Sequence, residues 1–88
     1  MRNIDPRRLE ALRTVERAYR DMVVRSLSVP DEEILKEPGV GPKTLRKRRR
    51  ADIERWTFAR GSRMAYERGG GFEEMFKWQD KFNWRFNK

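Results

Sequence analysis

The sequence predicts a small all-α protein, a bundle of three to five helices. Apolar residues recur at three- and four-residue spacing over long stretches, which is the period of an amphipathic helix. Glycine and proline gather at a few places between these stretches, where they would end one helix and begin the next. A chain of 88 residues without cysteine has room for one modest core. We therefore expect residues 1–88 to form a single domain.

The first expected element is an amphipathic helix over residues 5–27. Asp5 is a suitable N-cap, and Pro6 suits the first helical position. Glu16 and Arg20 have the spacing of an ion pair on one helical face. The apolar stripe consists of Leu9, Leu12, Val15, Tyr19, Met22 and Val23. Its favoured role is core packing, and a dimerisation seam is the alternative.

Residues 30–60 read as a short helix, a tight turn and a basic second helix. Ser28 or Asp31 can cap the short helix, and Pro38 ends it because proline fixes φ and lacks an N–H. Pro42 suits the first turn of the next helix, where a missing N–H costs nothing. We expect that helix to continue to a weak break at Gly61.

The turn itself contains two glycines, Gly39 and Gly41, on either side of Val40. Glycine is used where φ must be positive or where another backbone comes close. The free amides at the start of the following helix are a ready site for an anion. Six of the eight residues in 43–50 are basic and none is acidic. An anion-binding turn followed by a cationic helix indicates a phosphate backbone as ligand.

The turn also resembles a known motif. The residues concerned are Pro38-Gly39-Val40-Gly41-Pro42-Lys43-Thr44. They resemble the hairpin of helix-hairpin-helix DNA-binding motifs, which occur in DNA-repair and recombination proteins, over roughly 20 residues of the chain. The resemblance implies that the amides around Gly39, Val40 and Gly41 hold a DNA phosphate, with Lys43 assisting. The chain departs from the family pattern at Glu37 and at Arg48 and Arg49, where the family has apolar residues.

A second resemblance is to a helix-turn-helix, in which the basic helix enters the major groove and reads base edges. Both resemblances imply double-stranded DNA as partner, and the helix-hairpin-helix is favoured. The candidate DNA-binding residues are Gly39, Val40, Gly41, Lys43, Thr44, Arg46, Lys47 and Arg50. A plain αα-hairpin that binds nothing is the third interpretation.

The C-terminal part is predicted to be a glycine linker, residues 69–71, followed by an aromatic helix over 72–86. One helical face carries Phe72, Met75, Phe76, Gln79, Phe82 and Phe86. The favoured role of this helix is to fold back and complete the core. It could instead dock on a protein partner, or its aromatic rings could stack on unpaired bases. The candidate partner-binding residues are Phe72, Phe76, Trp78, Phe82 and Trp84.

Charge and composition narrow the function. The net charge is +8, and residues 45–88 carry thirteen basic against six acidic residues, whereas residues 1–44 carry nine against eight. Without histidine or cysteine, thiol chemistry, imidazole catalysis and the usual zinc ligands are excluded, so we expect no catalytic residue, no metal and no cofactor. No apolar run reaches the length of a membrane span, so we expect no membrane partner and a cytoplasmic protein, nucleoid-associated if bacterial or phage.

The expected function is therefore non-enzymatic binding of double-stranded DNA through its phosphate backbone, largely without sequence specificity. An interaction protein, for example an inhibitor or assembly factor that acts through residues 72–86, is the main alternative. RNA is also open as a partner, because a phosphate-binding turn does not by itself distinguish RNA from DNA.

Overall fold

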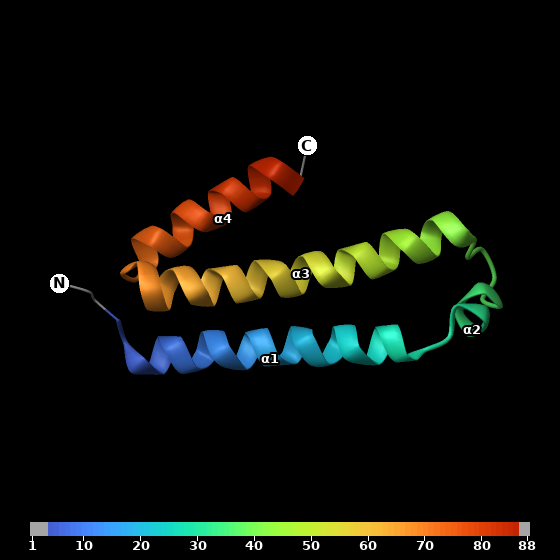
Figure 1. The fold of residues 1–88 in the computed structure, drawn as a ribbon, viewed down its shortest axis with the longest axis horizontal. Helices are drawn as coiled ribbons and strands as arrows, with labels where there is room; N and C mark the ends of the chain where they lie inside the picture. Colours follow the sequence, from blue (N-terminus) through green and yellow to red (C-terminus); the bar gives the residue numbers. More distant parts are fainter. Residues whose placement is uncertain (1–3, 87–88) are drawn as a thin grey trace.

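The computed structural model describes residues 4–86, and every regular element among them is an α-helix (Figure 1). The elements are α1 (Pro6–Ser28), α2 (Asp31–Leu35), α3 (Pro42–Gly69) and α4 (Phe72–Phe86). This confirms the predicted all-α fold. Helices α1 and α3 run antiparallel along the long axis, and α2 lies at the end where α1 leads into α3 (Figure 1).

Helix α3 is the centre of a flat arrangement. It packs against α1 and α4, which lie on opposite sides of it, and it contacts α2 near its own beginning (Figure 1). The molecule measures 53 × 27 × 15 Å and has a radius of gyration of 15.9 Å. A compact domain of this length would have a radius of about 12 Å. Few apolar side chains of the described residues are therefore buried, namely Val23, Leu45, Ala59, Tyr66 and Met75.

The two N-terminal helices begin in different ways. Asp5 caps α1 with its side chain, as predicted. Helix α2 begins after Pro30 without a side-chain cap, so the expectation that Ser28 or Asp31 would cap it is wrong. The Asp31 carboxylate instead forms an ion pair with Arg49 of α3 at 2.7 Å. This contact fastens the short helix to the long one.

Helix α3 is continuous through Gly61, so the predicted break there is wrong. A Cβ placed on Gly61 would collide with the six-membered ring of Trp78 in α4. Next to it, the buried Ser62 hydroxyl donates to the carbonyl of Phe58 at 2.8 Å and accepts from Gln79 at 3.0 Å. Gly61 is needed because an aromatic ring packs directly on the helix backbone, and it does not interrupt the helix.

The connection between α3 and α4 is a short hydrogen-bonded turn. Gly70 and Gly71 have φ angles of 116° and 99°, which is the left-handed region that favours glycine. Their amides both donate to the carbonyl of Tyr66. Helix α4 then runs back along α3 with Met75 buried between them. The expectation that this helix completes the core is confirmed.

The face of α4 that packs on α3 agrees with the predicted stripe in part. Met75 is buried, Gln79 donates to Ser62, and Phe82 packs on α3, as expected. Trp78, expected off the stripe, packs against Phe58 with ring centroids 5.7 Å apart, and Phe82 does so at 5.2 Å. Phe76, expected on the stripe, is 54% exposed. The side chain of Phe86 lies outside the described residues. Because the Trp78 ring lies directly against Gly61 of α3, the buried face of α4 includes Trp78. The apolar spacing within α4 alone cannot show this contact with another helix.

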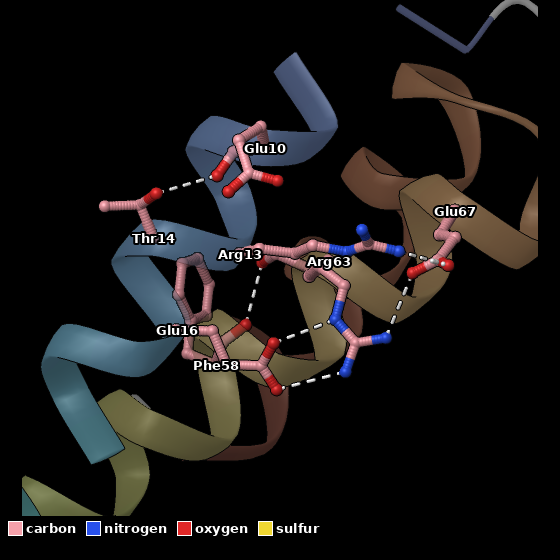
Figure 2. A network of polar contacts seen from close by, with 8 residues as sticks. Glu10, Arg13, Thr14, Glu16, Phe58, Arg63 and Glu67 are labelled. Atoms are coloured by element: carbon pink, nitrogen blue, oxygen red, sulfur yellow. Dashed lines mark hydrogen bonds and ion pairs between the residues drawn. The ribbon is translucent and has the colours of Figure 1, made fainter. Parts of the chain in front are cut away.

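A cluster of ion pairs joins α1 to α3 (Figure 2). The Arg63 guanidinium donates to both carboxylate oxygens of Glu16, at 2.8 and 3.1 Å, and to Glu67 at 3.1 Å. Arg13 completes the cluster through Glu67 at 2.9 Å. The expected pairing of Glu16 with Arg20 is therefore wrong. The two-pronged contact with Arg63 is partly buried and holds the carboxylate on the other helix.

This cluster predicts a specific loss of stability in acid. Hydrogen bonds from Arg63 lower the pKa of Glu16, against the opposing effect of burial. Because a folded-state pKa below the unfolded value stabilises the protein only above the unfolded pKa of about 4.3, this contribution disappears as the pH falls further. We expect Glu16→Gln to unfold at a lower temperature than the parent at pH 7, and this difference to shrink steadily as the pH is lowered below about 4.

Thermal unfolding followed by circular dichroism across this pH range is the measurement. Glu33→Gln is the matched control, because Glu33 is exposed and its one ion pair within residues 4–86 is with nearby Lys36. The thermal midpoint of the Glu33→Gln variant should differ little from that of the parent at every pH. A Glu16→Gln difference that stays constant down to pH 3 would contradict the assigned role of this carboxylate.

Candidate nucleic-acid interface

Main-chain hydrogen bonds hold the turn between α2 and α3 in shape. The amide of Glu37 donates to the carbonyl of Ile34 at 3.1 Å, and that of Val40 donates to Glu37 at 3.2 Å. Gly39 has a φ of +78°, so a residue with a side chain would be strained there. Gly41 is extended, with φ −101° and ψ 179°, and is the N-cap of α3 without a side-chain cap.

The beginning of α3 presents amides without acceptors. The first helical amide that donates to the main chain is that of Leu45, to Gly41 at 3.0 Å. Within residues 4–86, the amides of Gly41, Lys43 and Thr44 have no such acceptor. A Cβ on Gly41 would meet nothing within 4 Å, so the approach to this end is open. The amide of Val40 is already used inside the turn, so it is not part of this set.

The basic residues of 43–50 fall into two groups, and the first group is structural. Arg48 forms an ion pair with Glu37 at 2.9 Å, and Arg49 forms one with Asp31 at 2.7 Å. Arg49 also donates to the carbonyl of Val29 at 3.0 Å. Glu37, Arg48 and Arg49 are the three positions that depart from the helix-hairpin-helix pattern. Polar contacts therefore join α2 to α3 where that pattern has apolar ones.

The second group faces solvent. Lys43, Arg46, Lys47 and Arg50 are exposed and share one face of α3, at spacings of three, four and seven residues. None of the four has an ion-pair partner within the part of the chain that the structure describes. We call these four residues the cationic stripe. It begins beside the free amides of the α3 N-terminus, so both features attract the same anion or neighbouring ones.

The candidate partner-binding residues of α4 do not form one surface. Trp78 and Phe82 pack on α3, as described above. Phe72, the first residue of α4, stacks on Phe76 with ring centroids 5.7 Å apart and also packs on the buried Tyr66. Helix α4 begins at the end of the molecule opposite to α2 (Figure 1). Trp84 is 70% exposed in the last turn of α4. An aromatic docking face of the predicted kind is thus divided between the core and two separate exposed patches.

Other kinds of site find little support. Among residues 4–86 there is no group of three or more acidic side chains placed to hold a metal ion. No helix in the described range is both long and apolar enough to cross a membrane. No protein-family model, curated protein sequence or solved structure matches this chain.

Proposed function

We propose that the protein binds double-stranded DNA through the phosphate backbone, without catalysis and largely without sequence preference. The cationic stripe beside the free α3 amides is the observation that supports this proposal. Elsewhere in the described chain, many arginines are neutralised by carboxylates, including Arg13, Arg17, Arg48, Arg49 and Arg63. Four exposed, unpaired cations on one helical face concentrate positive charge at the end of the molecule where the anion-binding amides lie.

The two parts have different tasks in this proposal. The amides of Gly41, Lys43 and Thr44 hold one phosphate, helped by the positive end of the α3 dipole. From Lys43 to Arg50 the stripe extends about 10 Å along the helix. Projected on the duplex axis, that length spans about three steps of 3.4 Å, and hence about four phosphates of one strand. Phosphates carry no base information, so this contact gives affinity and little sequence discrimination.

A side chain that accepts hydrogen bonds from the free α3 amides would compete with a bound phosphate, so introducing one tests this proposal. Gly41 already has the extended backbone of an N-cap, and an Asn side chain there would accept hydrogen bonds from the free amides. We expect Gly41→Asn to keep or slightly raise the thermal midpoint while it weakens duplex binding about tenfold, or about 1.4 kcal/mol. Because the variant gains a cap, reduced binding cannot result from unfolding.

Fluorescence anisotropy with several unrelated duplexes provides the affinities. Gly41→Ala is the matched control, because it adds a Cβ in open space but no acceptor. It should bind more like the parent than Gly41→Asn does. If Gly41→Asn is folded and binds duplex as the parent does, the amides do not hold phosphate. A strong sequence preference that Arg46→Ala abolishes would instead favour base reading by a helix-turn-helix.

The same binding experiment tests RNA as a partner, and a negative result in it bears on the alternative of a protein partner. An RNA duplex of the same sequence is the competitor for the first, since its phosphates carry the same charge in a different groove geometry. If the folded protein binds neither DNA nor RNA, the proposed function is wrong. The exposed aromatic residues of α4, Phe76 and Trp84, would then be the surface to test for binding of a protein partner.

A further inference from the structure

An open groove of about 660 Å³ lies between the middle of α3 and the C-terminal half of α4. Arg46 and Arg50 line it from α3, and Phe82 lines it from α4. Helix α4 diverges from α3 toward its C-terminal end, which accounts for the position of the groove (Figure 1). Both arginines also belong to the cationic stripe, so the groove opens onto the proposed path of the phosphate backbone.

The groove has apolar walls that are fixed in place. Ile53 is 43% exposed although it lies in the middle of the central helix. Aromatic neighbours fix the ring of Phe82, among them Phe58 in an edge-on contact and Trp78 in a stacked one, both at 5.2 Å. A ring fixed in this way is a preorganised surface for a planar apolar group.

One carboxylate lines the groove, among three arginines and the Thr57 hydroxyl. The side chain of Glu54 lines it and is partly buried, and no hydrogen bond or ion pair joins it to another residue in 4–86. A carboxylate accepts hydrogen bonds only, so its natural partner is an N–H donor. The amino groups of nucleic-acid bases are such donors, and they are carried on flat rings.

We propose that this groove takes one unpaired base of the bound DNA. The base stacks against Phe82 and Ile53, its amino group donates to Glu54, and the phosphates beside it contact Arg46 and Arg50. The inference rests on the proposed DNA binding and extends it. The protein then prefers a duplex with an unpaired nucleotide over a fully paired one. An acidic peptide would pair with the arginines but carries no flat, amino-bearing ring to fill the space between Phe82 and Glu54.

The experiment compares one blunt duplex with the same duplex carrying a single unpaired 2-aminopurine. We expect about tenfold tighter binding of the second, together with quenching of 2-aminopurine fluorescence as the base stacks. Phe82→Leu and Ile53→Ala should each reduce this preference and leave the affinity for the blunt duplex unchanged. Ile53→Ala alters an exposed side chain, so it remains informative if Phe82→Leu weakens the packing of α4.

Trp84→Ala is the matched control, because it removes a large exposed aromatic ring of α4 that does not line this groove. It should keep the full preference. Equal affinity of the parent for the two duplexes would overturn the groove proposal and leave duplex binding intact. Failure to bind either duplex would overturn the proposed function itself. Ile53-dependent binding of an acidic peptide, with no preference between the duplexes, would assign the groove to a protein and contradict the proposal.

Discussion

Replacing Gly61 by alanine is expected to destabilise the protein by about 2 kcal/mol, although alanine is the best helix former. Helix propensity alone predicts a gain of about 1 kcal/mol at this position. The new methyl group would, however, occupy the space of the Trp78 ring, and the helix backbone cannot move away without disturbing the α3–α4 contact. For a domain of this size the thermal midpoint should fall by about 8–16 °C.

A double-mutant cycle with Trp78→Ala isolates the collision. If the methyl group and the ring compete for one space, the double variant should be more stable than the sum of the single losses predicts. Thermal unfolding by circular dichroism gives the three differences. A Gly61→Ala protein that melts above the parent would show that α4 does not pack on the α3 backbone at this point.

Removing the cationic stripe is expected to have the largest effect on binding. Changing Lys43, Arg46, Lys47 and Arg50 to glutamine leaves every ion pair of the described fold in place. With about 1 kcal/mol for each lost contact, the affinity for duplex DNA should fall by at least about a hundredfold. The thermal midpoint should hardly change, because exposed unpaired charges contribute little to folding.

A second variant has to show that the loss of affinity for duplex DNA does not result from the lower net charge alone. The matched control changes four exposed basic residues elsewhere that have no ion-pair partner within residues 4–86, namely Arg7, Arg60, Arg68 and Lys81. Both variants lose the same four charges. We expect the control to retain affinity within about tenfold of the parent, since only long-range attraction is reduced. Equal losses in the two variants would contradict a localised interface.

The starts of α1 and α3 were predictable because their signals are local, whereas that of α2, which lacks a side-chain cap, was not. Asp5 followed by Pro6 predicted the beginning of α1, and the structure has its N-cap there. Pro42 predicted the first residue of α3 in the same way. Such signals depend only on the backbone needs of the first turn, which neighbouring residues satisfy. The spacing of the apolar residues predicted the all-helical class that residues 4–86 have.

Contacts between distant residues were not predictable in this way. Gly61 read as a helix break because the residue that requires it, Trp78, lies seventeen positions later on another helix. Glu16 had a suitable partner four residues away, yet it pairs with Arg63 across the α1–α3 contact. In both cases tertiary packing overrides a plausible local pattern.

Residues 43–50 of the candidate interface contain one feature that was predictable from local sequence and one that was not. The basic run predicted a cationic surface, and the spacing placed Lys43 and Arg50 on one face. The sequence could not indicate that Arg48 and Arg49 are occupied, because their carboxylates come from α2 and the turn after it. The groove beside Phe82 was also missed, since it depends on how α4 diverges from α3.

The salt dependence of duplex binding tests the central claim most directly. Four phosphate contacts should give a slope of about −3.6 in a plot of log affinity against log salt concentration. The parent and the Arg7, Arg60, Arg68 and Lys81 control should share this slope, and the stripe variant should lose most of it. A parent slope near zero, or a stripe variant with the slope of the parent, would contradict phosphate binding by the cationic stripe.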